Sequence, residues 1–454
     1  MLADAVAAIT AEAGEMAMAR WRTDFRRWEK VPGSPVCEVD LDVDALLHDR
    51  LGRLLPEAGW LSEETADRPD RLGRERIWVV DPIDGTRDYI RGRPGWAVSV
   101  ALVEAGGRDR SPWIHVPVGY FRTMGHPRLD WRYRTEPDPG LGGRALNWPR
   151  GKVLGGSSSL NGLLYVRGQR EDYDRWAQMG NPGWSWEQVG PVFEALETWQ
   201  DGSGAGRGTS GPLQVSAPRL RREVCELWLQ AAQARGHPLN PDYNGVAQDG
   251  VAHFQLTASR GRRSSAATAF LRPVRGRRNL EVVTEAQATR VLVEEGRATG
   301  VELRRPDGTR RVLRASREVI LCAGSIGSPQ LLMLSGVGDG EHLGQHGIAV
   351  AHHAPEVGRN LQDHLQARLV FRCHAPTLND EARSPWGRAR MAAEYAVLRT
   401  GPMSMAASLA VGFMRTRPGL ATPDVQFHIQ PWSADSPGEG VHPFSAFTQS
   451  VCQL

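Results

Sequence analysis

The chain has 454 residues, a formal net charge of +3 and 41% hydrophobic residues, enough apolar material for the cores of two or three domains. No run of about 18 apolar residues is present, and Asp4 and Glu12 interrupt the first segment, so we expect neither a transmembrane helix nor a signal peptide. Five scattered cysteines without a CxxC pair argue against a disulfide framework and a zinc site. The composition predicts a cytoplasmic globular protein with reduced thiols.

Two helices and a strand are predicted in the first eighty residues. Apolar residues recur at spacings of three and four over residues 3–21 and 41–60, which is typical of amphipathic helices. The apolar, β-branched run Ile77–Val80 is short enough to be a buried strand. It leads directly into DPIDGT, residues 81–86.

The DPIDGT segment places oxygen ligands at the end of this strand. Asp81 and Asp84 can converge there, with the Ile83 carbonyl between them, and Glu63 precedes the same strand. Hard cations such as Mg²⁺ prefer such oxygen clusters, and a substrate phosphate can fill further positions. The alternative is an ordinary polar turn after a strand. The nearby carboxylates favour the metal site.

Residues 1–103 resemble the inositol monophosphatase family through DPIDGT and the upstream SEE. The resemblance implies an α/β segment with Mg²⁺-dependent phosphatase activity. It also implies metal ligands and two residues that orient the attacking water: Glu63, Asp81, Ile83 through its carbonyl and Asp84 for the metal, and Asp40 and Thr86 for the water. The second half of that family, with a further metal-binding aspartate, is not recognisable after residue 104. We therefore expect weak or absent hydrolysis.

Residues 147–168, NWPRGKVLGGSSSLNGLLYVRG, concentrate glycine and serine. Glycine removes the Cβ atom and allows positive φ, so backbone amides can approach a bulky anionic ligand. A flexible linker is the alternative interpretation, but the flanking residues are too apolar for one. The segment predicts a ligand site.

Successive strands are predicted over residues 279–323. The sequence alternates polar and apolar residues, with Pro306–Gly308 as a hairpin turn. It ends in VILCAGSIGSPQLLMLSGVG, which predicts a buried strand, a turn at 324–328 and a short apolar helix. Nucleotide-binding sheets approach their ligands through this arrangement.

Five ordered motifs across residues 102–454 resemble the glucose-methanol-choline (GMC) family of FAD-dependent oxidoreductases, nearest to its choline and alcohol dehydrogenases. The motifs are GKVLGGSSSLNGLLYVRG, EDYDRWAQMGNPGWSWEQVGPVFEALE, RRSSAATAFLRP, AGSIGSPQLLMLSGVG and VGRNLQDHL. The resemblance implies oxidation of a choline-like or other primary alcohol by hydride transfer to FAD. It implies these cofactor-binding residues: Glu104, Gly151, Val153, Gly155, Gly156, Ser157, Asn161, Gly162, Ala288 and Gly324. Leu160 replaces the histidine that some relatives join covalently to flavin, so FAD is expected to bind non-covalently.

Two parts of the GMC pattern are not found. The amino-terminal dinucleotide fingerprint should precede LVEAGG, but the phosphatase-like segment occupies that position. A GxGxxG match at Gly206, Gly208 and Gly211 has no strand before it, so we interpret it as a loop. The catalytic histidine of the family would lie beyond Leu454. His364 and His428 are not assigned as bases, because the resemblance places neither at the catalytic position.

These observations predict a chain of mixed α/β and α+β class in two parts. Residues 1–103 are expected to be the phosphatase-like fragment, and residues 104–454 an incomplete GMC FAD-binding fold with a substrate-domain sheet. The hypothesis is a fusion in which the FAD-dependent activity is impaired. A magnesium-dependent phosphatase and a non-functional chimera are the alternatives. Seven arginines in residues 259–278 could form a nucleic-acid patch, but few aromatics accompany them, and we expect no nucleic-acid partner.

Overall fold

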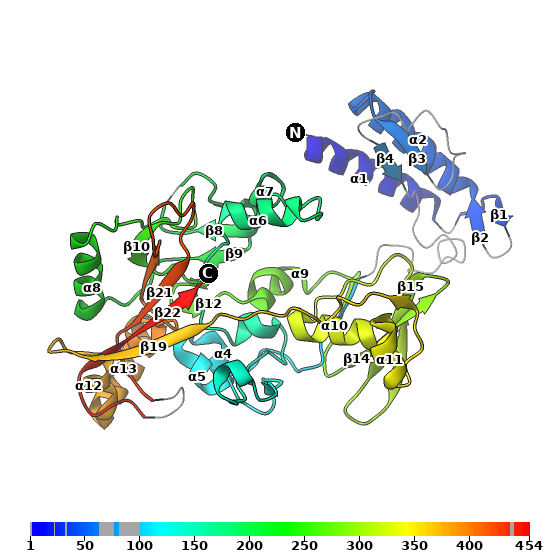
Figure 1. The fold of residues 1–454 in the computed structure, drawn as a ribbon. Helices are drawn as coiled ribbons and strands as arrows, with labels where there is room; N and C mark the ends of the chain where they lie inside the picture. Colours follow the sequence, from blue (N-terminus) through cyan, green and yellow to red (C-terminus); the bar gives the residue numbers. More distant parts are fainter. Residues whose placement is uncertain are drawn as a thin grey trace. The chain divides into compact units, whose positions relative to one another are not determined.

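The computed structural model describes residues 2–21, 23–31, 34–62, 77–80, 100–202, 204–435 and 440–454. The chain divides into two units, which Figure 1 draws as a ribbon. The first unit is Met1–Leu102 with Gly276–Val282, and the second is Val103–Arg275 with Val283–Leu454. The assignment of the two predicted parts to different families stays a prediction.

Helices α1 (Leu2–Arg20) and α2 (Glu38–Leu54) form the core of the first unit, as the helical spacing predicts. Ala13 and Ala17 of α1 pack in one buried cluster with Val43 and Leu47 of α2. Strand β4 (Ile77–Val80) confirms the predicted strand, and it pairs in parallel with β3 (Gly59–Ser62). The hairpin β1 (Arg27–Val31) and β2 (Ser34–Cys37) precedes α2.

The amino end of α2 begins at residue 38, three residues before the predicted start, because Asp40 caps it. The Asp40 carboxylate accepts a hydrogen bond of 2.7 Å from the Cys37 backbone N–H. A side chain that satisfies a free N–H at a helix start stabilises that end. Asp40 is fully buried.

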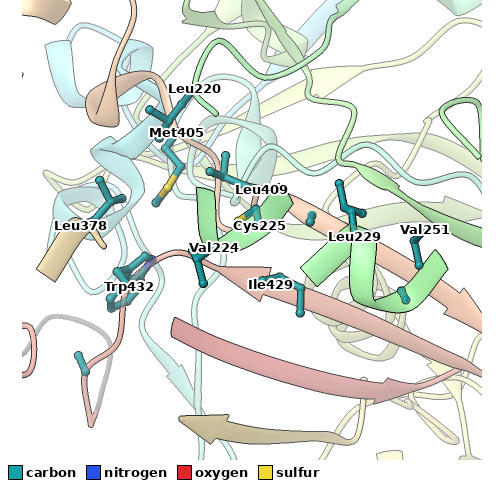
Figure 2. Packing of buried hydrophobic residues seen from close by; sticks show 13 residues of the cluster. Leu220, Val224, Cys225, Leu229, Val251, Leu378, Met405, Leu409, Ile429 and Trp432 are labelled. Atoms are coloured by element: carbon teal, nitrogen blue, oxygen red, sulfur yellow. The ribbon is translucent and has the colours of Figure 1, made fainter. Parts of the chain in front are cut away.

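A five-stranded antiparallel sheet is the largest sheet of the second unit. Its order is β10 (Gly250–His253), β20 (Ala410–Met414), β21 (Val425–Gln430), β22 (Ala446–Gln453) and β19 (Gln366–Arg372). Helix α8 (Glu223–Ala234) packs on one face of it through Val224, Cys225 and Leu229. Figure 2 shows these side chains against Val251 of β10 and Ile429 of β21.

Predicted hairpins after residue 279 are confirmed. Strand β13 (Leu280–Val283) pairs with β5 (Val100–Val103), and β14 (Gln287–Glu294), β15 (Arg297–Arg304) and β16 (Arg310–Arg314) form a three-stranded antiparallel sheet. The predicted turn at 306–308 joins β15 to β16. Helix α10 (Gly324–Leu334) follows, as predicted.

The predicted buried strand immediately before α10 is wrong. Residues 319–323 adopt no strand, Ile320 is 73% exposed and Cys322 is exposed. A strand needs a hydrogen-bonded neighbour, and residues 319–323 pair with none of the described strands. The last contact with the three-stranded sheet is at Ala315, whose N–H donates to the Thr299 carbonyl of β15 at 3.0 Å.

The remaining elements are short segments of the second unit. The helices are α4 (Pro112–His115), α5 (Tyr120–Thr123), α6 (Arg170–Gln178), α7 (Trp186–Leu196), α9 (Arg272–Val274), α11 (Gly340–Gln345), α12 (Leu378–Arg383) and α13 (Pro385–Leu398). The strands are β6 (Tyr133–Arg134), β7 (Asn147–Trp148), β8 (Glu197–Trp199), β9 (Leu213–Val215), β11 (Ala258–Ser259), β12 (Arg262–Arg263), β17 (Val337–Gly338) and β18 (His352–His353). Single helical turns lie at Pro117–Gly119, Pro139–Leu141, Gly156–Ser159, Ala267–Leu271 and Pro402–Ser404.

Candidate cofactor site

Glu104 follows β5 directly, as the sequence predicts for the residue at the end of this strand. Its backbone N–H donates to the Val283 carbonyl at 2.9 Å, and its carbonyl accepts from the Ala286 N–H at 3.1 Å. The carboxylate accepts from the Gly106 N–H at 2.7 Å. Burial raises the pKa of this carboxyl to about 7, although the Gly106 N–H and the Lys152 ammonium act in the opposite direction. Glu104 is thus a fixed acceptor in a half-buried setting.

The turn after Glu104 lies directly against the glycine-rich segment. Gly107 and Val153 form a parallel bridge, and the Leu154 N–H donates to the Gly107 carbonyl at 3.0 Å. A Cβ atom at Gly106 would lie 1.9 Å from the Lys152 carbonyl oxygen, well inside van der Waals contact. Only glycine permits this approach, which brings the Glu104 strand end beside the predicted ligand loop.

Residues 151–162 form a packed loop. Gly155 and Gly156 have φ values of +88° and +53°, and a Cβ atom at Gly151 would lie 2.2 Å from the Gly156 carbonyl. The Ser157 hydroxyl accepts from the Gly151 N–H at 3.1 Å, and the Asn161 N–H donates to the Ser157 carbonyl at 2.8 Å. These contacts disagree with a flexible linker.

The loop has a buried side and an open side. Val153, Leu160 and Ile114 make a small buried cluster beneath it, while Ser157 and Asn161 are exposed. Val153 is buried as a whole residue, side chain and backbone alike, so it supports the loop from its buried side. Leu160 offers no group that could bond covalently to flavin.

Ala288 lies on β14, and Gly324 begins α10, which packs against β14. Ala288 packs in the cluster of Val283, Ala286 and Leu303, which also receives Val103 from β5. Gly324 begins α10 with a φ of +80° and is exposed. Helix α10 connects to β14 through Ser335, whose hydroxyl accepts from the Val291 N–H at 2.8 Å. Helix α10, which begins at Gly324, therefore packs against β14, and β14 shares a buried cluster with the strand β5 that precedes Glu104.

Sequence reasoning missed Arg263 as a partner of the loop. Its guanidinium donates to the Ser158 carbonyl at 3.1 Å and to the Asn161 side-chain oxygen at 2.7 Å. The side chain is buried, so this arginine does not belong to a surface patch for nucleic acid. The signal that could have found it is its place inside RRSSAATAFLRP, whose Ala266 N–H donates to the Ser158 hydroxyl at 2.8 Å.

The GxGxxG match lies in a loop between β8 and β9, which confirms the predicted loop, although the short strand β8 precedes it, contrary to the expectation from the sequence. A Cβ atom at Gly208 would lie 1.9 Å from the Glu194 carbonyl, and one at Gly211 would lie 2.3 Å from the Leu196 carbonyl carbon. These glycines serve chain packing. The next element after them is strand β9 rather than a helix, so they do not form a dinucleotide fingerprint.

Of the two histidines left unassigned, His428 lies on β21 of the large sheet and His364 lies two residues before β19. His428 of β21 has its pKa lowered to about 4, by burial first and by His364 second, so it is neutral at pH 7. His364 is exposed, and its Nδ1 lies 2.9 Å from the buried Cys452 Sγ. Neither contact identifies a base.

The predicted magnesium ligands cannot be placed. Glu63, Asp81, Ile83 and Asp84, together with Thr86, lie outside the described residues. Within the described ranges no group of three or more His, Cys, Asp or Glu side chains could hold a metal ion. Asp40, expected to orient a water, caps α2, and its expected role stays a prediction.

Comparisons with known proteins find the same family for most of the chain. The family model described as GMC oxidoreductase matches residues 12–366. Choline dehydrogenase of Mus musculus, named as mitochondrial, is 41% identical over 339 residues. Oxygen-dependent choline dehydrogenase of Rhizobium etli is 40% identical over 334 residues. The crystal structure of pyridoxine 4-oxidase from Mesorbium loti matches with a TM-score of 0.67 and 29% identity.

The chain spans about three fifths of the length of the choline dehydrogenases that it matches. Each choline dehydrogenase match covers 73% of this chain, but 57% of the mouse protein and 60% of the Rhizobium protein. The structural match covers 79% of this chain and 67% of the oxidase. The family model begins at residue 12, so it includes most of the segment interpreted as phosphatase-like. Among the described helices, none is long and apolar enough to cross a membrane.

Proposed function

This chain belongs to the GMC oxidoreductase family, and on that premise we propose that it binds FAD non-covalently and oxidises a small alcohol. The observation that carries the proposal is the direct contact between the Glu104 strand end and the glycine loop of residues 151–162. Three glycines in this contact region, Gly106, Gly151 and Gly155, leave no room for a side chain, because an added Cβ atom would lie 2.5 Å or less from a neighbouring atom.

The described residues fit a dinucleotide cofactor. Glu104 would hold the ribose hydroxyls, the backbone of Gly151–Gly162 would receive the pyrophosphate and flavin, and the backbone near Ala288 would meet the adenine. The fully buried Val153 and the 2% exposed Leu160 support the loop from beneath. Bound there, FAD would supply the two-electron acceptor for the hydrogen on the alcohol carbon. The group that takes the hydroxyl proton is not assigned.

The experiment that tests the proposal is a titration of the purified chain with FAD. We expect saturable binding with a perturbed flavin absorption spectrum, and release of all the flavin when the protein is denatured, because no covalent link is proposed. Anaerobic addition of choline or another primary alcohol should then bleach the flavin absorbance. Absence of FAD binding by a folded protein would refute the assignment.

The substrate class and the location of the protein are further parts of the proposal. A choline-like alcohol is proposed because two of the relatives are named choline dehydrogenases. Other primary alcohols form the comparison set in the bleaching experiment. A cytoplasmic location stays a prediction.

The phosphatase and chimera alternatives depend on the sequence alone. Mg²⁺-dependent release of phosphate by the purified chain, lost in Asp84→Asn, would support the phosphatase interpretation. Aggregation together with neither flavin binding nor phosphate release would support a non-functional chimera. Both readouts come from the same preparation as the FAD titration.

A further inference from the structure

Arg263 is a buried cation whose hydrogen bonds all go to neutral groups. It is 4% exposed, and it donates to the Ile114 carbonyl at 2.8 Å, the Ser158 carbonyl at 3.1 Å and the Asn161 side-chain oxygen at 2.7 Å. Its second terminal nitrogen, Nη2, is buried without a hydrogen-bond partner in the structure. In the described part of the chain no ion pair includes Arg263.

This arrangement differs from that of the other buried arginines nearby. Arg167 and Arg207 are as deeply buried, but both lie within 2.8 Å of the Glu197 carboxylate. A buried charge without a counter-ion is costly, and a guanidinium does not lose its proton to avoid the cost. The unpaired charge of Arg263 is therefore a feature that requires a compensating anion.

We infer that Arg263 is a positioning residue of the FAD site, and that its charge is compensated by the cofactor's own negative charge. The inference rests on the proposed function. Arg263 acts through the loop, because it holds the Ser158 carbonyl and the Asn161 amide oxygen on the side where Asn161 is exposed. The Asn161 oxygen also accepts from the Leu163 N–H at 3.2 Å, which leaves the amide NH₂ as the donor group.

The negative charge could come from two parts of FAD. The pyrophosphate carries charge in every redox state, whereas the isoalloxazine ring gains negative charge on reduction. A cation held in a region of low dielectric stabilises either charge without having to reorganise. Affinity for oxidised FAD reports on the pyrophosphate, and the flavin reduction potential reports on the reduced ring.

The test compares wild type with Arg263→Gln, Arg263→Lys, Asn161→Asp and Asn161→Ala. Arg263→Gln should weaken oxidised FAD binding about tenfold or more, or make the reduction potential more negative, and Arg263→Lys should restore part of the loss. Asn161→Asp keeps the side-chain shape but places a carboxylate on Arg263. Because this carboxylate would neutralise the Arg263 charge that the cofactor needs, Asn161→Asp should weaken FAD binding more than Asn161→Ala does. A merely structural role of Arg263 does not predict this order of the two variants.

Arg262→Gln is the matched control, because Arg262 is the exposed neighbour of Arg263 on β12. This variant should bind FAD with the affinity of the wild type. If all the Arg263 and Asn161 variants bind FAD within about twofold of wild type and keep its reduction potential, the inference is wrong while the proposed function stands. If wild type itself binds no FAD, the proposed function fails and the inference fails with it. Asn161→Asp keeps the test valid should Arg263→Gln not fold.

Discussion

Residues 151–162 and residues 319–323 were both predicted to approach a nucleotide, yet they differ in the structure. The first segment packs against Gly107, Ala266 and Ala407, all in the same unit. The second segment has the apolar pattern of a buried strand but pairs with no described strand, and Ile320 is 73% exposed. A loop needs local contacts, whereas a strand needs another strand beside it. A sequence pattern that depends on contacts within the loop therefore forms here, whereas a pattern that depends on a neighbouring strand does not.

The largest expected effect is that of Gly151→Ala. The added methyl group would lie 2.2 Å from the Gly156 carbonyl, so the loop must move. We expect at least a hundredfold loss of FAD affinity and a decrease of about 1–3 kcal/mol in the free energy of unfolding. Fluorescence titration and thermal unfolding measure the two effects. Gly344→Ala is the control, because no atom lies near the added methyl group, and equal behaviour of the two variants would refute the packed loop.

An intermediate effect on FAD affinity is expected from protonation or substitution of the Glu104 carboxylate. The carboxylate form accepts hydrogen bonds from ribose hydroxyls, and its pKa in the free protein is raised to about 7. FAD affinity should therefore fall as the pH decreases below about 7, and it should be constant above it. Glu104→Gln should bind about tenfold more weakly at pH 8 and lose this pH dependence.

The free protein should show the opposite trend in stability. Because folding raises the pKa of the Glu104 carboxyl, its contribution to the free energy of unfolding decreases as the pH rises from the unfolded value toward about 7. Glu295→Gln, at an exposed hairpin position, serves as the control. A pH-independent affinity of the wild type would contradict the role of Glu104.

The smallest effect is expected for Ile320→Ser. An exposed side chain contributes little to stability, so the free energy of unfolding should change by about 0.5 kcal/mol or less. Leu303→Ala is the contrasting variant, because Leu303 is 2% exposed in the cluster with Val283 and Ala286, and should cost about 2–5 kcal/mol. A cost of similar size for Ile320→Ser would mean that Ile320 is buried, as the predicted strand at residues 319–323 requires.

Local patterns in the sequence predicted much of the fold. The spacing of apolar residues indicated α1 and α2, and turn residues indicated the hairpin between β15 and β16. The start of α2 was placed too late, because capping by Asp40 overrides the apolar periodicity. These features depend on residues close together in the chain.

The site was predicted in part. Glycine content indicated the loop, and Glu104 was placed correctly after a strand. Arg263 was missed because its neighbours Arg260 and Arg262 made the stretch resemble a basic surface, and one-dimensional sequence does not show which arginine points inward. The strand prediction for residues 319–323 was wrong because an apolar run does not show whether another strand lies beside it, and no described strand pairs with these residues.

Strand β19 has a practical consequence for work with the purified protein. It forms one edge of the five-stranded sheet, and Leu369, Val370 and Phe371 are each at least 41% exposed. An open edge with apolar side chains can add a strand from another molecule, and Arg368 and Arg372 oppose this by mutual repulsion. Salt screens that repulsion. Preparations are therefore best concentrated in dilute buffer, with light scattering recorded before any spectrum is interpreted.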